Sequence, residues 1–209
     1  PRYTDPSMDA AARIKHLARE HGFALCGLAA VPADGAAPRA LALRDWLAQK
    51  RDGPLEYVAK SAAARMNLRA RFPWAKSVLC AAVFYDAQER GARGRDLVAH
   101  VARYARGRDY HLILTKRLKA LGQALEGAGL CGRAHYYVDT GPVLERAWAE
   151  RSGVGWIGKN ACLIHPRHGS FMLLGELLLD AAVEPDAPEA DHCGSCTRCL
   201  DACPTQALP

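Results

Sequence analysis

The sequence predicts an α/β domain with a mixed β-sheet, followed by a short cysteine-rich module. Helical spacing of apolar residues alternates with short, continuous apolar runs along the first 183 residues. The acidic, proline-bearing segment 184–191 then separates this domain from a cluster of cysteines and is typical of a linker. We therefore predict a domain at 1–183 and a linker with a cysteine module at 184–209, because 209 residues suffice for one core and a small addition.

The elements follow from local patterns in chain order. Ile14 and Leu17 have helical spacing, and Gly22 ends that helix. Amphipathic spacing predicts two further helices, at 38–50 and 112–125. Continuous apolar runs predict buried strands at 23–31, 77–85 and 131–138. Two more strands, at 161–164 and 170–179, flank a turn signal and are expected to form a hairpin.

Charge is distributed unevenly along the chain. Residues 60–119 carry 14 Lys and Arg against 4 Asp and Glu, whereas residues 176–191 carry six acidic residues and no basic one. A basic belt of this density is typical of a partner that is a polyanion, and a solvated helical face is the alternative. The first 25 residues are charged, and no apolar run reaches the roughly 20 residues of a membrane span. We expect a soluble, cytoplasmic protein.

The most specific motif is the cysteine run, which has the pattern C-x2-C-x2-C-x3-C-P and consists of Cys193, Cys196, Cys199 and Cys203. In bacterial ferredoxins with this pattern the fourth cysteine ligates the other cluster of a two-cluster module. Zinc is the alternative, but zinc sites usually take ligands from two pairs that stand a dozen or more residues apart. The run therefore predicts an iron–sulfur site.

Four other cysteines stand singly among apolar residues: Cys26, Cys80, Cys131 and Cys162. Free cysteine is among the most buried residue types, so we expect these four to be structural. Unpaired thiols and oxygen-sensitive clusters suit a reducing compartment, in agreement with a cytoplasmic location.

Residues 136–148 are rich in groups that do chemistry. Asp139 follows a predicted strand, precedes a turn at Gly141-Pro142, and is followed by a predicted helix that contains Arg146. Strand ends in open α/β sheets are where ligands bind, but an aspartate here is also a good turn former and helix cap. The glycine-rich segment 153–160 would let the backbone approach a flat ligand closely, or would simply form a tight loop.

Four motifs in this order resemble the epoxyqueuosine reductase family: residues 104–111, residues 138–146, residues 155–160 and the cysteine run. These motifs are spread over about half of the chain. The resemblance implies a cobalamin-binding α/β domain related to reductive dehalogenases, followed by a ferredoxin-like module with two 4Fe-4S clusters. It also implies the reduction of epoxyqueuosine to queuosine in tRNA, the last step of queuosine biosynthesis.

The resemblance also assigns roles to individual residues. Asp139 is implied to be the catalytic proton donor, and Arg146 to orient or charge-balance it, with an ion pair to Glu145 or Glu150 as the alternative for Arg146. A carboxyl group that carries a proton near neutral pH must be shielded from water, which burial beside a corrin would achieve. The residues implied to lie at the cofactor are Tyr110, His111, Trp156, Lys159 and Asn160.

The implied partners are the anticodon region of tRNA as substrate and an external electron donor, with no membrane and a monomeric protein. The family's second cysteine motif and helical repeat domain do not follow Pro209, so we expect a truncated form of the family's chain. Two alternatives stay open. One is a cobalamin-dependent reductase of a small molecule, as in reductive dehalogenases, which use a tyrosine as proton donor. The other is a non-enzymatic iron–sulfur electron carrier.

Overall fold

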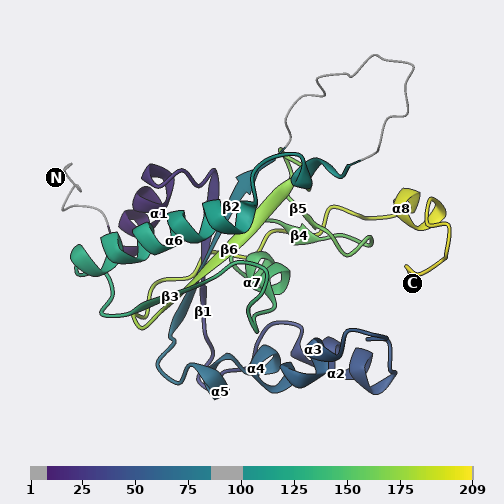
Figure 1. Cartoon of the computed structure of the whole chain (residues 1–209), viewed down its shortest axis with the longest axis horizontal. Coiled ribbons are helices and arrows are strands. Elements are labelled where there is room, and N and C mark those ends of the chain that lie inside the picture. Colours follow the sequence, from purple (N-terminus) through teal and green to yellow (C-terminus); the bar gives the residue numbers. More distant parts are fainter. Residues whose placement is uncertain (1–8, 86–100, 209) are drawn as a thin grey trace, which may run out of the picture.

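The computed structural model describes residues 9–85 and 101–208, and a four-stranded β-sheet lies at its centre (Figure 1). The strand order is β1-β2-β6-β3. The strands are β1 (Leu25–Ala30), β2 (Ser77–Phe84), β3 (Ala134–Tyr137) and β6 (Met172–Leu179). The α/β class is confirmed. Every pairing in the described sheet is antiparallel, however, so the expectation of a mixed sheet was wrong. The strands β2 and β3, on either side of α6 in the chain, do run in the same direction, but β6 lies between them and runs the opposite way.

Helices cover both faces of this sheet (Figure 1). Helices α1 (Ala10–Glu20) and α6 (Tyr110–Gly127) pack on one face, and α7 (Glu145–Arg151) packs on the other. A group of short helices lies beside α7 and consists of α2 (Ala40–Ala48), α3 (Glu56–Lys60), α4 (Ala62–Met66) and α5 (Leu68–Arg71). The 3₁₀ turn η1 (Arg103–Ala105) precedes α6, and α8 (Arg198–Asp201) lies in the cysteine run.

The core is divided into two layers by the sheet. Along β2, Leu79 and Ala81 belong to the layer under α1 and α6, whereas Val78, Cys80 and Ala82 belong to the layer under α7. This alternation is the period of two that strand geometry dictates. Because β2 and β6 are the central strands, both of their faces are covered. The sequence of β2 is the continuous apolar run that was predicted, and β6 is apolar except for Glu176.

The predicted hairpin was wrong. Strand β5 (Leu163–Ile164) pairs with β4 (Trp156–Ile157), while β6 pairs with β2 and β3. The turn between β5 and β6 is real and is closed by an isolated bridge between His165 and Gly169. Strand β4, in the glycine-rich segment, is the pairing partner of β5. Strand β6 is longer and largely apolar, and it lies in the core sheet between β2 and β3.

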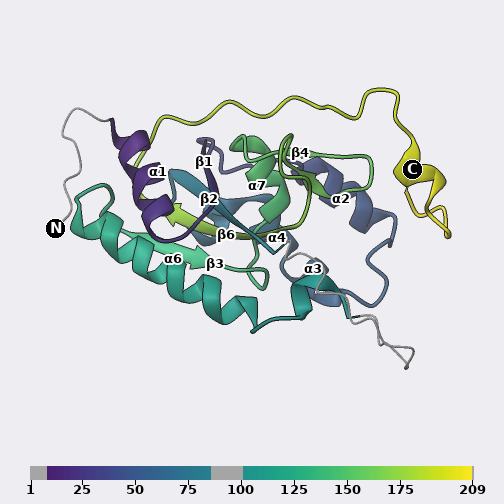
Figure 2. The same ribbon diagram turned by 90° about the horizontal axis from the view of Figure 1, so that it is seen from above.

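The acidic segment 184–191 does not run free of the domain. The backbone N–H of Asp186 donates to the carbonyl of Leu28 at 2.9 Å, and the Asp186 carboxylate accepts from the N–H of Leu28 at 2.9 Å. Lys15 on α1 also pairs with this carboxylate at 2.6 Å. The segment therefore lies along the edge strand β1 before it continues to the cysteine run (Figure 2).

None of the helices within residues 9–85 and 101–208 is both long enough and apolar enough to cross a membrane. Part of the predicted basic belt, including Arg90, Arg93 and Arg95, lies outside the described residues. Within the described part, some of its cations bond to main-chain carbonyls: Arg69 to Ala75 and Arg117 to Gly22.

Gly27 lets α7 approach the sheet. A Cβ atom at this position of β1 would lie 2.0 Å from the carbonyl oxygen of Ser152, at the end of α7. We predict that Gly27→Ala lowers the free energy of unfolding by about 2 kcal/mol or more, because neither backbone can yield without breaking its pairing. Urea denaturation measures this effect. The control is Gly127→Ala, where the added methyl meets nothing within 4 Å, and equal effects at both positions would contradict the prediction.

Candidate active site

Asp139 occupies a strained turn directly after β3. Its φ is 57°, in the left-handed region that few non-glycine residues adopt. The N–H of Thr140 donates to the carbonyl of Val138 at 2.6 Å, which closes a three-residue γ-turn around Asp139. The backbone N–H of Asp139 donates to Oε1 of Glu145 at 2.5 Å. Strained backbone of this kind clusters at functional sites, where surrounding contacts enforce it.

The side chain of Asp139 projects from the turn and does not cap a helix. It is 60% exposed. Helix α7 has Leu144 at its N-cap position and no side-chain cap bond, so the helix-capping alternative does not apply to the following helix. Shielding from water, which proton donation requires, would have to come from a bound molecule because this chain's own residues leave the carboxylate open.

Two residues at the start of α6 face Asp139. The hydroxyl of Tyr110 donates to Oδ2 of Asp139 at 2.9 Å, and Nε2 of His111 lies 3.3 Å from the same oxygen. The other ring nitrogen of His111 lies 2.8 Å from the Asp109 carboxylate. Asp109 also accepts from the backbone N–H of His111 at 2.9 Å and thus caps α6. The structure therefore brings together three predicted site residues, and Asp109 orients one of them.

These contacts bias the titration of both rings. The pKa of His111 is raised mainly by the hydrogen bond between its ring and Asp109, and further by the one with Asp139. Burial, followed by the hydrogen bond to Asp139, raises the pKa of Tyr110. Tyr110 therefore stays a neutral donor to Asp139, and His111 more readily carries the positive charge that balances it.

Beneath this surface cluster lies a pair of acids that sequence reasoning missed. Glu176 on β6 is 0% exposed and stands opposite Tyr137 on β3 and Cys80 on β2. Burial and the charge of Glu145 raise the pKa of Glu176 well above its usual value, and burial raises the pKa of Glu145 to about 7. The sequence does contain a sign of this pair, because Glu176 is the one charged residue in the otherwise apolar strand β6.

Arg146 does not bond to Asp139 in this structure. It lies in the first turn of α7, and its guanidinium donates to the main-chain carbonyl of Ala161. It pairs with neither Glu145 nor Glu150 among the described contacts, and Glu150 instead pairs with Arg39 at 2.8 Å. Arg146 therefore ties α7 to the loop after β4, and its role at Asp139 stays a prediction.

The glycine-rich segment meets the cysteine run, which links two motifs that the sequence presented separately. The indole N–H of Trp156 donates to Sγ of Cys193 at 3.4 Å. The ammonium group of Lys159 donates to the carbonyls of Gly194 at 2.8 Å and Cys196 at 3.0 Å. Asn160, in contrast, accepts a hydrogen bond from the N–H of Cys162, at 3.0 Å, within its own loop. Trp156 and Lys159 therefore anchor the cysteine run to the domain.

The cysteine run has the right ligands for an iron–sulfur cluster in type and spacing, but its thiols are not gathered. Within the described residues, no group of three or more His, Cys, Asp and Glu side chains converges to hold a metal ion. Of the four isolated cysteines, Cys80 and Cys131 are buried as expected and Cys26 is half-buried. Cys162 is exposed, so its predicted burial was wrong: the loop between β4 and β5 carries it outward.

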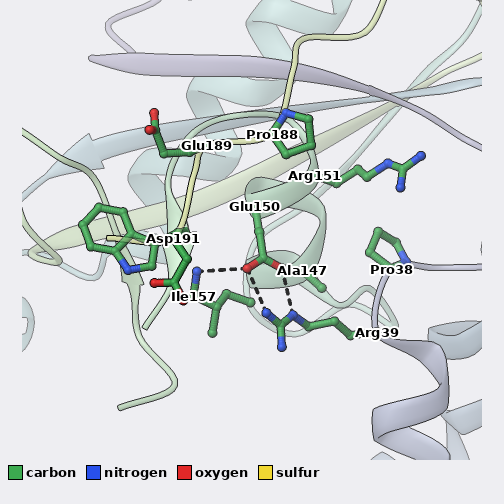
Figure 3. A pocket seen from close by; sticks show the side chains of 10 residues that line it. Pro38, Arg39, Ala147, Glu150, Arg151, Ile157, Pro188, Glu189 and Asp191 are labelled. Carbon is green, nitrogen blue, oxygen red and sulfur yellow. Dashed lines mark hydrogen bonds and ion pairs between the residues drawn. The ribbon is translucent and has the colours of Figure 1, made fainter. Parts of the chain in front are cut away.

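Two cavities lie near this site without including Asp139. One, of about 380 Å³, lies between α7 and the segment 184–191; its floor is formed by Glu150, which accepts from Arg39 and from the N–H of Ile157 (Figure 3). These bonds give Glu150 a structural role. The other, of about 570 Å³, lies along the outer face of α6, and its charged lining includes Arg108, Lys116 and Arg117.

Comparison with known proteins shows which proteins this chain is similar to. The family model described as epoxyqueuosine reductase QueG, DUF1730, matches residues 65–140, which include Tyr110, His111 and Asp139. The epoxyqueuosine reductase of Gloeobacter violaceus is 46% identical over 200 residues, which is 95% of this chain and 60% of that protein. The protein of the same name from Xanthomonas campestris is 40% identical, over 98% of this chain and 58% of its own length.

The chain belongs to the epoxyqueuosine reductase family. It spans about 60% of the length of the curated relatives it matches. The structure of the Streptococcus thermophilus epoxyqueuosine reductase matches 97% of this chain and 54% of its own chain, with a TM-score of 0.77 and 30% identity. A structure of an epoxyqueuosine reductase with an epoxyqueuosine-modified tRNA stem loop matches with a TM-score of 0.74 and 30% identity, over 94% and 52% of the two chains.

The catabolic reductive dehalogenase NpRdhA shares the fold, with a TM-score of 0.53 and 18% identity over 96% of this chain and 24% of its own. The fold relationship that the sequence resemblance implied is therefore confirmed.

The buried acids make stability depend on pH. The pKa of Glu145 rises from 4.5 to about 7 on folding. A raised acid pKa stabilises the fold fully below the unfolded pKa, and this stabilisation is lost as pH rises through the folded pKa. One pKa unit corresponds to about 1.4 kcal/mol. We therefore predict that ionisation of Glu145 lowers the free energy of unfolding by up to about 3 kcal/mol as the pH rises from 5 to 8.

Urea denaturation across this pH range checks the prediction by comparison with Glu145→Gln, which should lack this part of the decline. Glu126→Gln is the control, because the exposed Glu126 carboxylate also accepts a backbone N–H, that of Ala134 at 2.9 Å. A Glu145→Gln variant with the wild-type pH dependence would refute the assignment.

Proposed function

We propose that this chain carries the catalytic domain of an epoxyqueuosine reductase, which reduces the epoxide of epoxyqueuosine in tRNA to give queuosine. The observation that carries the proposal is the strained Asp139 turn, whose exposed carboxylate is bonded by Tyr110 and flanked by His111. Membership of the family supports it. We further infer a domain at 1–183 followed by a module at 184–209, and a cytoplasmic, monomeric protein.

The residues suit two cofactors. Cobalamin would lie against the Asp139 turn and the glycine-rich segment, in which Gly155 and Gly158 let the backbone pack closely against Ile164. Tyr110, His111, Trp156, Lys159 and Asn160 would border it. In the cysteine run, Cys193, Cys196 and Cys199 would ligate one 4Fe-4S cluster and Cys203 a second, which the run alone cannot complete. Trp156 and Lys159 would support the loop by hydrogen bonds. When bound, cobalamin and the clusters supply the two electrons that no side chain can provide.

The chain's own residues manage the protons. Conversion of an epoxide to an alkene consumes two electrons and two protons and releases the oxygen as water. Asp139 gives a proton to the oxygen as its bond to carbon breaks, because an unprotonated alkoxide is a poor leaving group. Tyr110 holds the carboxyl group in place, and His111, with its raised pKa, balances the charge that remains on Asp139.

The substrate class follows from charge. Arg108, Lys116 and Arg117 line the cavity on the outer face of α6, the helix whose first turn carries Tyr110 and His111. Such cations suit tRNA phosphates, and an external donor would supply the electrons. Reduction of a small halogenated molecule is a second candidate because the fold is shared with NpRdhA. An acid at Asp139 and the neighbouring cations favour tRNA over that candidate and over a simple electron carrier.

Asp139→Asn keeps the size of the side chain and removes its acid. We predict that turnover of tRNA-bound epoxyqueuosine falls by about 100-fold or more, whereas cobalamin binding is unchanged, since general acids contribute about 10²- to 10⁴-fold. Single-turnover assays on the anaerobically reconstituted protein, with product nucleosides resolved by mass spectrometry, provide the measurement. An undiminished rate would remove Asp139 from the role of proton donor.

Anaerobic reconstitution with iron, sulfide and cobalamin tests the cofactors. We predict that the chain binds cobalamin, detected by its absorption spectrum, and that Cys196→Ala loses at least half of the bound iron while retaining cobalamin, because the run would lose a thiolate ligand. Cys162→Ala is the matched control, since Cys162 is also exposed but lies outside the run. Absence of cobalamin binding by the wild-type chain would overturn the proposal.

A further inference from the structure

Glu176 is a buried acid whose carboxyl oxygens accept no hydrogen bond from an N–H or O–H group among the described residues. Its side chain is 0% exposed, and burial, the charge of Glu145 and a hydrogen bond with the Glu145 side chain raise its pKa. An isolated carboxylate in this position is strongly disfavoured, whereas a neutral carboxylic acid is tolerated and has a hydrogen to donate. The hydrogen requires an acceptor, and the candidates are the groups that face Glu176.

The groups around Glu176 leave one good acceptor. Cys80 stands opposite it on β2, and its own pKa is raised mainly by burial, so its thiol is neutral. Besides burial, the negative charge of Glu145 and, less strongly, that of Asp139 raise the pKa of Glu176. The pKa of Glu145 is in turn raised by burial and by the charge of Asp139, and lowered by a hydrogen bond with Glu176 and by the charge of Arg65 on α4. The charge of Glu145 also raises the pKa of Tyr110. Glu145 is therefore the acceptor that lies within reach.

Glu145 already accepts one hydrogen bond that matters. Its Oε1 accepts from the backbone N–H of Asp139 at 2.5 Å, and this residue holds a φ of 57°. A carboxylate accepts such a bond more strongly than a neutral acid. A second donor, directed at the same carboxylate from the protein interior, would favour the charged form of Glu145 and oppose the increase in its pKa that burial causes.

We propose that Glu176 is a positioning residue that stays protonated and donates its hydrogen to Glu145, so that Glu145 holds the Asp139 turn as a carboxylate. The importance of this turn for catalysis rests on the proposed function. The contact with Asp139 is made through its main-chain N–H, so Glu145 holds the turn and does not deliver a proton to the Asp139 carboxyl.

The test follows the ionisation of Glu145 directly, in the 209-residue chain without cofactors. Carbon-13 labelling of glutamate lets NMR record the side-chain carboxyl shift of Glu145 against pH, with the signal assigned by its absence in Glu145→Gln. The amide signal of Asp139 should move with the same midpoint, because the two groups share a hydrogen bond.

Two substitutions at Glu176 separate the outcomes. In Glu176→Gln the amide N–H₂ replaces the neutral acid as donor, so the Glu145 midpoint should stay within about half a pH unit of the wild type. In Glu176→Leu the donor is lost while burial remains, so the midpoint should rise by about one pH unit or more, a tenfold change in proton affinity. Glu126→Gln serves as control and should change neither signal.

Each alternative predicts a different pattern. If Glu176 were itself a carboxylate, Glu176→Gln would lower the Glu145 midpoint by more than one unit, because a repelling charge would disappear. If Glu176 only filled space, Glu176→Leu would leave the midpoint unchanged. Either result overturns the proposal. Circular dichroism confirms that each variant folds, and Glu176→Gln, which is isosteric, decides the first alternative even if Glu176→Leu does not fold.

Activity of the reconstituted protein supplies an independent readout. Glu176→Leu should lower kcat at least tenfold, with KM for the tRNA within about twofold of the wild type, and Glu176→Gln should restore most of the rate. If the wild type does not reduce epoxyqueuosine at all, the proposed function fails while the NMR titration still decides the role of Glu176. If the wild type is active and both variants match it, the positioning role is refuted.

Discussion

The hydrogen bond from the Asp139 N–H to the Glu145 carboxylate connects the parts on which the site depends. It joins the end of β3 to the start of α7 and holds a backbone conformation that an aspartate adopts only under constraint. The Glu145 carboxyl group is partly buried next to Glu176 on β6, whose pKa is raised by burial and by the charge of Glu145. The same contact therefore links the surface turn to the central strands. Loss of this bond would release the turn toward ordinary φ values and move the Asp139 side chain away from Tyr110.

The rigid part of the molecule is arranged so that α7 can be held this close to the sheet. Gly27 admits the end of α7 against β1, and Gly155 admits the carbonyl of Ile164 between β4 and β5, where a Cβ would lie 2.3 Å from it. Trp148 on α7 is buried with the apolar side chains of β2 and β6. The start of α7 is therefore fixed by packing along its length, and the position of Glu145 follows from that packing.

The sequence predicted the elements better than their pairing. The apolar runs of β2 and β6 and the spacing of Leu114, Leu118 and Leu121 in α6 are local signals, and the structure has a strand or a helix at each. Strand direction and partner depend on contacts between distant residues, so the antiparallel sheet and the β4-β5 pair could not be read from one stretch of chain. Asp139, Tyr110 and His111 could be proposed because they lie in motifs, whereas Glu176 gives no motif and becomes meaningful only through its neighbours on β2 and β3.

The Asp139 cluster and the cysteine run are built on different elements of the fold. The Asp139 cluster is built on β3, α6 and α7, whereas the cysteine run is attached through Trp156 and Lys159 to the segment around β4. Arg146 crosses between them, because it leaves α7 next to Glu145 and bonds to Ala161 in the loop that follows β4. Helix α7 thus links the two parts: the strained turn precedes its first residue, and the glycine-rich segment follows its last.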